Sequence, residues 1–192
     1  MELDFSFLQQ STLFAKYFAN SQKLNLLYEI EDYRDVVSNI RRLSESLVKE
    51  LFAVEQLDPY YPLKEQKQRS FRSDLFYLQA QHFYPQEIME LFHEIRRMGN
   101  DAVHDNNYHW TKQAAWHCLG NYHDILVYLM NTYEQTKLAY IRPDLIIASS
   151  SFPTRSNKLA TNHHETRQKN YRQKRQQTSK LKKFLRRKNI LT

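Results

Sequence analysis

Glycine is scarce in this chain, and its scarcity limits the folds that the chain can form. Gly99 and Gly120 are the only two glycines among 192 residues, and prolines are few before Pro143. Glycine supplies the positive φ angles that tight turns require, so a turn-rich all-β fold would need many more of them. A phosphate-binding loop or a dinucleotide-binding G-x-G-x-x-G motif also requires glycines. The sequence therefore predicts long helices, excludes a nucleotide-driven motor within this chain, and gives no reason to expect a cofactor.

Apolar residues recur at helical spacing along most of the chain up to about residue 137. Polar caps and prolines separate the expected helices, which cover about residues 4–19, 21–30, 32–57, 63–81, 85–104 and 111–137. Asp32 is expected to cap a central helix, and Thr111 to cap the last one. The expected core residues of the helix over 63–81 are Phe71, Leu75, Phe76 and Leu78. We therefore expect an all-α fold, an antiparallel helical bundle of about five or six helices with short connections.

Charge divides the chain into an acidic body and a basic tail. Residues 1–141 hold 14 Lys and Arg against 19 Asp and Glu, a net charge of −5, whereas residues 142–192 hold 14 against 2, a net charge of +12. We predict a bundle over 1–141, a linker over 142–162 and a basic, flexible tail over 163–192 that binds nucleic acid. The candidate nucleic-acid-binding residues are Arg167, Lys169, Arg172, Lys174, Arg175, Lys180, Lys182, Lys183, Arg186, Arg187 and Lys188.

Cysteine use and hydropathy favour a cytoplasmic protein. Cys118 is the only cysteine, so no disulfide can form within the chain, and its apolar helical setting predicts a buried, unreactive thiol. No apolar run approaches the roughly 20 residues that a membrane-spanning helix needs. The first residues, with Glu2 and Asp4, also lack the basic segment of a signal peptide.

A candidate site lies in the segment IRRMGNDAVH, residues 95–104. On a regular helix the residues expected to pack are Ile88, Leu91, Phe92, Ile95, Met98, Gly99, Ala102 and Val103. The opposite side carries His93, Arg97, Asn100 and His104, with Arg97 and His104 almost aligned two turns apart. A histidine can exchange protons with a ribose hydroxyl or a leaving oxygen, an arginine can hold a phosphate, and Asn100 can hydrogen-bond either the substrate or the histidine. By spacing alone, an ordinary solvated helix face remains the favoured interpretation.

Two segments carry a resemblance to a known family. Residues 40–51 read IRRLSESLVKEL and residues 85–105 read PQEIMELFHEIRRMGNDAVHD. In this order, followed by a long helix, they resemble the helical domain at the N-terminus of type I restriction enzyme R subunits, which belongs to the HEPN superfamily. The resemblance covers roughly residues 5–133.

The resemblance implies two alternatives for function. HEPN ribonucleases are metal-independent endoribonucleases that use an arginine followed after four to six residues by a histidine, usually across a homodimer. Arg97 and His104 satisfy this spacing, but in the restriction-subunit relatives the arginine corresponds better to Arg96, about 80° from His104 on a regular helix. Those relatives use the domain as an accessory to a motor and nuclease that this chain lacks.

We therefore predict a HEPN-like module of a prokaryotic restriction or phage-defence system that acts in dimerisation, sensing or nucleic-acid binding. The alternative is an endoribonuclease, a toxin or defence effector, in which Arg97 and His104 act across a homodimer, with Asn100 and Arg96 as further candidate catalytic residues. RNA would be the substrate for cleavage, and DNA is the alternative ligand. As a module, the protein could also bind a partner subunit of a defence complex.

Other polar residues point to no further chemistry. His109, His117 and His123 lack the i, i+4 spacing and the supporting cysteines of a metal site, so we expect none. Glu45 and Glu50 are expected to pair with arginines, Arg96 among them.

Overall fold

The computed structural model describes residues 2–61, 69–104 and 109–142, and these form an all-α bundle, as the sequence predicted. The chain divides into two units, residues 1–153 and 154–192, and all the described residues belong to the first. The elements in chain order are the 3-10 helices η1 (Ser6–Gln10) and η2 (Ala15–Tyr17), then α1 (Phe18–Glu29), α2 (Tyr33–Val54), η3 (Asp58–Tyr60), α3 (Phe71–Ala80), α4 (Gln86–His104) and α5 (Lys112–Tyr133). The predicted linker and tail lie outside the described residues from residue 143 onward.

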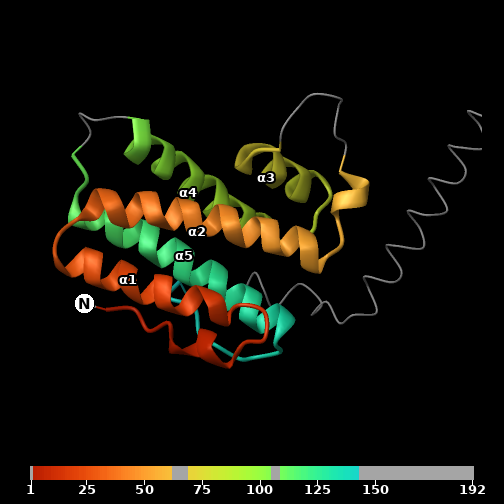
Figure 1. The fold of residues 1–192 in the computed structure, drawn as a ribbon, viewed down its shortest axis with the longest axis horizontal. Helices are drawn as coiled ribbons and strands as arrows, with labels where there is room; N and C mark the ends of the chain where they lie inside the picture. The colour runs from red at the N-terminus through yellow and green to blue at the C-terminus, as the bar shows by residue number, and fades with distance from the viewer. Residues whose placement is uncertain (1, 62–68, 105–108, 143–192) are drawn as a thin grey trace, which may run out of the picture. The chain divides into compact units, whose positions relative to one another are not determined.

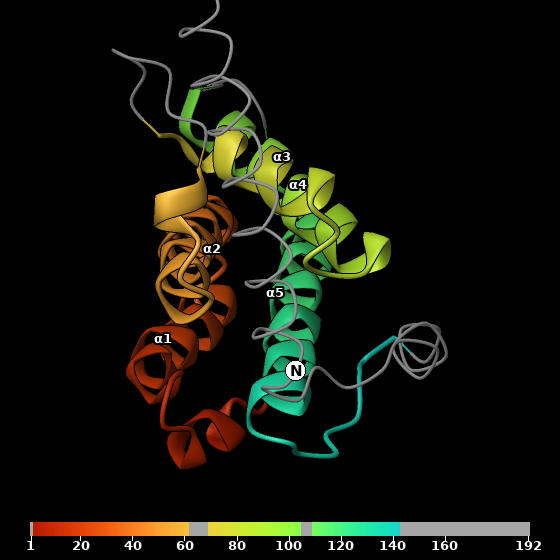
Figure 2. The same ribbon diagram turned by 90° about the vertical axis from the view of Figure 1, so that its right-hand side faces the viewer.

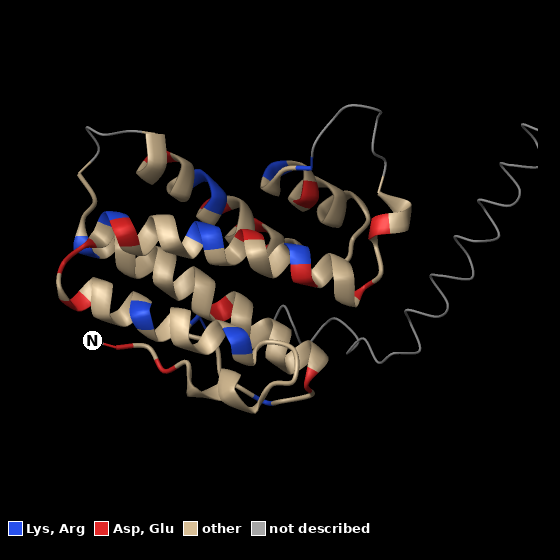
Figure 3. Cartoon of the chain, in the orientation of Figure 1, with Lys and Arg blue, Asp and Glu red and all other residues tan. Residues whose placement is uncertain are grey.

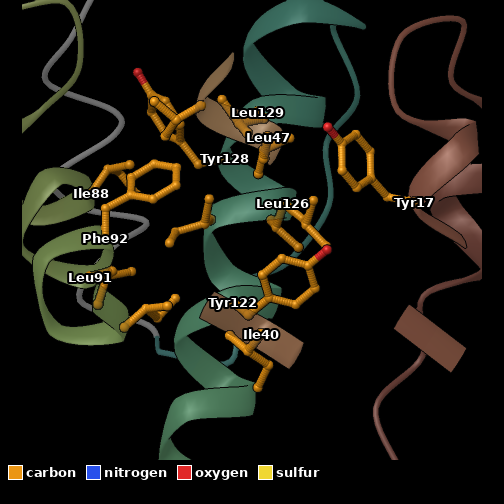
Figure 4. Packing of buried hydrophobic residues seen from close by; sticks show 14 of the residues in the cluster. Tyr17, Ile40, Leu47, Ile88, Leu91, Phe92, Tyr122, Leu126, Tyr128 and Leu129 are labelled. Carbon is orange, nitrogen blue, oxygen red and sulfur yellow. The ribbon is translucent and has the colours of Figure 1, made fainter. Parts of the chain in front are cut away.

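Helix α5 is the centre of the bundle. Every residue from Cys118 to Met130 is buried, so this helix is covered on all sides. Helices α1, α2 and α4 all pack on it, and α2 and α4 also form an extensive contact with each other (Figure 1, Figure 2). Figure 4 shows Ile40 of α2 beside the Tyr122 side chain of α5, and Ile88, Leu91 and Phe92 of α4 on the other side of α5.

The helix after Asp32, predicted to be central, is α2, and it packs against α1, α3, α4 and α5. Helix α2 keeps an exposed charged face along one side, as amphipathic outer helices do. Helix α5, by contrast, buries the polar residues Asn121, His123 and Asp124 along with its apolar ones. The structure buries them with hydrogen bonds: Asp124 Oδ1 accepts from the Ile141 backbone N–H at 2.8 Å, and His123 Nε2 lies 3.2 Å from the Asp4 carbonyl oxygen.

Polar caps define the helix starts where the sequence predicted them. The Asp32 side chain accepts a hydrogen bond from the Asp35 N–H at 3.2 Å, and the Thr111 hydroxyl accepts from the Ala114 N–H at 3.2 Å. Helix α3 begins later than expected, because Ser70 and Ser73 form a capping box at its start. The core prediction for this helix is confirmed for Phe71, Leu75 and Leu78 but wrong for Phe76, which is 51% exposed.

The first expected helix, over residues 4–19, is wrong. The Ser11 hydroxyl accepts hydrogen bonds from the Leu13 and Phe14 N–H groups, and Ser11 itself is extended. The Glu134 carboxylate accepts from the Ser11 and Thr12 hydroxyls and from backbone N–H groups of the same turn. These side chains supply the partners that a helix would give the backbone, so the segment folds as two short 3-10 turns instead.

Non-glycine residues in left-handed conformations follow four helices, and one of them is Gln135, which follows α5 with a φ angle of 56°. Glu31, Gln56 and His82 have φ angles of 65°, 51° and 52° and follow α1, α2 and α3. Each lies at the position of a Schellman motif that glycine usually occupies; after α1, for example, the Asp32 N–H bonds the Leu27 carbonyl at 3.0 Å. The scarcity of glycine therefore reflects polar residues in these αL positions as well as a low number of turns.

Gly99 allows α4 to approach α2 closely. A Cβ atom built on Gly99 would lie 2.3 Å from the Arg41 Cβ and 2.5 Å from its Cδ. The Arg34 Nε donates to the Ala102 carbonyl at 2.7 Å, which gives one of the last α4 carbonyls a positively charged partner. These contacts show that α2 and α4 run antiparallel, with the start of α2 beside the end of α4.

None of the helices in the described ranges is both long enough and apolar enough to cross a membrane.

Replacing Gly99 by alanine should destabilise the protein by about 1–3 kcal/mol, because the added methyl group overlaps the stem of Arg41 and forces α2 and α4 apart. Gly120→Ala is the matched control, since a Cβ there meets nothing within 4 Å. It should stabilise the protein by about 0.5–1 kcal/mol through helix propensity. Urea unfolding of both variants tests this, and equal effects would show that Gly99 does not set the helix spacing.

Candidate functional site

Helix α4 separates a packing face from a charged face. Ile88, Phe92, Ile95, Gly99 and Ala102 are buried, as predicted. The exception is Val103, which was expected to pack but is 47% exposed. The helix continues without a break to His104, so ideal helical geometry applies along the candidate site.

This regularity places Arg97, and not Arg96, on the same side of α4 as His104. Arg97 and His104 are seven positions apart, with six residues between them, which corresponds to a difference of about 20° around the axis and a rise of about 10 Å. Both side chains are exposed, and Asn100 between them is half-buried. Within the described part of the chain, no hydrogen bond holds the side chain of Arg97, Asn100 or His104. No third group in this part orients the histidine in the way that a preformed active site would require.

Arg96 belongs to a different group of side chains. It is half-buried, and its Nε atom is buried without a hydrogen-bond partner among the described residues; the same holds for the Nε of Arg41 on α2. Burial, followed by the positive charges of Arg72, Arg97 and Arg41, lowers the pKa of Arg96. Arg41, Arg72, Arg96 and Arg97 therefore form one positively charged group, contributed by α2, α3 and α4. In Figure 3, Lys and Arg are coloured blue on these three helices.

The expected carboxylate partners of this group are absent. Glu45 pairs with Lys49 at i+4, and Glu50 pairs with Lys16. The prediction that these two glutamates would pair with arginines, including Arg96, is therefore wrong. Lys49, one turn along α2, pairs with Glu45, and Lys16, just before α1, pairs with Glu50.

His93 links α3 to the charged face of α4. Its Nε2 lies 2.9 Å from the Gln79 side-chain oxygen, and its ring packs against Phe76 with centroids 5.5 Å apart. Burial and the positive charges of Arg96 and Arg97 lower the pKa of this histidine. His93 and Phe76 line an open cavity of about 670 Å³ together with Arg96 and Arg97.

A second polar network includes two further residues of the cavity lining, Glu94 and Arg142. Glu94 accepts hydrogen bonds from His117 Nε2 at 3.0 Å and from the Asn121 amide at 2.8 Å, and the Arg142 guanidinium reaches His117 Nδ1 and the Asn121 oxygen. Burial alone would raise the pKa of Glu94, but the bonds from His117 and Asn121, with the charge of Arg142, lower it. Sequence reasoning missed this network because its members lie on two helices and a later segment.

The remaining candidates divide between the core and residues outside the described ranges. Cys118 is buried, as predicted, and burial raises the pKa of its thiol. His117 and His123 belong to separate networks, and in the described ranges no three His, Cys, Asp or Glu side chains gather as metal ligands would. All the candidate nucleic-acid-binding residues of the tail lie outside the described residues.

Residues 23–162 match the family described as Domain of unknown function (DUF4145). The chain belongs to this family. The matched range begins within α1 and includes α2 to α5, so the DUF4145 domain contains both the arginine group and the Arg97–His104 face. Neither a curated protein nor a solved structure matches the chain.

In this DUF4145 domain, Arg97→Gln should raise the pKa of His93, because the substitution removes a positive charge that disfavours the imidazolium. Titration of the His93 ring by NMR measures this directly. Arg42→Gln removes the same charge from an exposed position of α2 and should leave the His93 pKa unchanged. A His93 pKa that does not differ between the two variants would contradict the described charge environment.

Proposed function

We propose that this protein is a HEPN-like nucleic-acid-binding module of a prokaryotic restriction or phage-defence system. The observation that carries the proposal is the positively charged group of Arg41, Arg72, Arg96 and Arg97, which has no carboxylate partner among the described residues. The Nε atoms of Arg41 and Arg96 in this group are buried without a partner among the described residues, and buried polar atoms rarely lack one unless a ligand supplies it. The tail, with its net positive charge, adds a second basic segment in the same chain.

The exposed face of α4 supports binding more than catalysis. Arg97 and His104 are about 10 Å apart along the helix axis, and within the described ranges neither is held by a hydrogen bond. Efficient acid–base catalysis needs a histidine held in one orientation beside the reacting group. A single chain of this structure does not hold His104 in that way.

A metal-independent endoribonuclease is the second candidate. It is favoured by the alignment of Arg97 with His104 on one side of an unbroken helix, at the spacing found in HEPN ribonucleases. In this alternative a homodimer brings two such faces together, and the second chain supplies the missing contacts. A toxin or defence effector would use this arrangement, with Asn100 held against the substrate.

Nucleic-acid binding should depend steeply on salt, with log affinity falling by about 0.7 per tenfold rise in salt for each phosphate contact to a single strand. A full-length variant with every Lys and Arg of residues 163–192 replaced by Gln should lose most of that slope. Fluorescence anisotropy with a labelled single-stranded oligonucleotide measures both. Binding that does not vary with salt would exclude an electrostatic mode.

Cleavage of single-stranded RNA in the presence of EDTA separates the two candidates. The module predicts no cleavage by the purified protein at any protein concentration, for the wild type and for His104→Ala alike. The ribonuclease predicts cleavage that rises with dimer concentration and disappears in His104→Ala. Cleavage by the wild type alone would therefore replace the first candidate with the second.

A further inference from the structure

Three helices bring the four arginines together. The Arg41 side chain lies along Gly99 of α4, one turn beyond Arg96. On the other side, the Arg72 guanidinium lies 5.6 Å from the centre of the Phe76 ring, and Phe76 packs on His93, one turn before Arg96. Arg96 is therefore near arginines of both α2 and α3, and the charges of Arg41, Arg72 and Arg97 all act on it.

Arginines that serve structure in this protein have partners. Arg69 donates to Asp58 and Asp74 and lies over the rings of Phe52 and Tyr61, 4.1 Å and 4.8 Å from their centres. The Arg34 Nε donates to the Ala102 carbonyl. The buried Nε atoms of Arg41 and Arg96 have no such partner among the described residues, and these two side chains lie in a group of like charges.

A bound anion would accept hydrogen bonds from the unpartnered Nε atoms and would also offset the repulsion among the like charges. A phosphate group has several acceptor oxygens and a negative charge, and the planar guanidinium fork matches its geometry. The carboxylates that line the same cavity are exposed or engaged elsewhere: Glu94 bonds His117 and Asn121, and Glu90 accepts from Gln86. Among the described residues, none of these carboxylates forms an ion pair with an arginine of the group.

An exposed aromatic ring lies beside this charge. Phe76 is 51% exposed and lines the cavity, and its ring contacts His93 and lies near Arg72. A single exposed apolar side chain is ordinary on a protein surface, and what distinguishes Phe76 is its position beside Arg72 and in the lining of the cavity. Unpaired bases stack on aromatic and guanidinium faces next to phosphate contacts in proteins that bind single strands.

We propose that Arg41, Arg72 and Arg96 bind a backbone phosphate of a single-stranded nucleic acid and that Phe76 stacks on the neighbouring base. This site belongs to the bundle, is separate from the basic tail, and is distinct from the Arg97–His104 face. It rests on the proposed nucleic-acid-binding function and specifies where on the bundle a strand binds.

The test uses the full-length protein in which the Lys and Arg residues of the tail, residues 163–192, are replaced by Gln. The cationic residues that remain are then those of the bundle and the linker. Binding of a labelled single-stranded oligonucleotide is measured by anisotropy at several salt concentrations. Arg72→Gln should lower the salt dependence by about 0.7 in the slope of log affinity. Phe76→Leu should weaken binding at least about fivefold and leave that slope unchanged. Arg42→Gln, the matched loss of an exposed charge on α2, should change neither.

Thermal unfolding with inorganic phosphate provides an independent readout. Phosphate should raise the melting temperature of the wild type. Arg96→Gln should melt higher than the wild type without phosphate, since it relieves repulsion within the group, and should gain less from added phosphate. A variant that is merely misfolded would melt lower and could not give this result.

Each outcome has a definite meaning. If Arg72→Gln and Phe76→Leu both bind the oligonucleotide as Arg42→Gln does, the proposed bundle site is wrong. The proposed nucleic-acid-binding function would still hold if the wild type, with its intact tail, binds the oligonucleotide. If the wild type binds no oligonucleotide, the proposed function itself fails. Loss of oligonucleotide binding in Arg72→Gln with no effect of Phe76→Leu would show a phosphate contact without base stacking, and would overturn the role proposed for Phe76.

Discussion

The contact between Gly99 and the stem of Arg41 sets the spacing of α2 and α4, and the proposed site depends on that spacing. A side chain at position 99 would separate the two helices, because its Cβ would overlap the Arg41 Cβ at 2.3 Å. The same contact lays Arg41 across α4 and brings its guanidinium near that of Arg96. A packing constraint at a single residue thus produces the concentration of positive charge.

That concentration of charge distinguishes two classes of arginine in the bundle. Arg69 and Arg34 satisfy carboxylates or a helix end and so stabilise the fold. Arg41 and Arg96 have buried nitrogen atoms without partners in the described ranges, which costs stability. Stability given up at one place in a structure is characteristic of a binding site, where a ligand restores it.

Local sequence signals predicted the fold well where local interactions decide it. The caps at Asp32 and Thr111 and the packing face of α4 follow from residue type and helical spacing alone. The predicted helix over residues 4–19 failed because Glu134, more than a hundred residues away, binds the Ser11 turn. No window of local sequence contains that contact.

In the candidate site, too, features within one helix were predicted and features that join several helices were missed. Helical geometry aligned Arg97 with His104, and the unbroken α4 agrees with it. The arginine group went unrecognised because Arg41, Arg72 and Arg96 lie on three helices, and because the nearby glutamates pair with lysines instead. Phe76 was assigned to the core because helical spacing marks it as apolar but does not show which neighbours cover it.

The most direct test of the phosphate site observes the arginine side chains themselves. In ¹⁵N NMR spectra of the full-length protein, the Nε–H signals of Arg41 and Arg96 should shift when a single-stranded oligonucleotide is added, because a phosphate then accepts their hydrogen bonds. The Arg34 Nε–H, already bonded to the Ala102 carbonyl, should remain in place. Unshifted Arg41 and Arg96 signals at saturating oligonucleotide would contradict a phosphate site in the bundle.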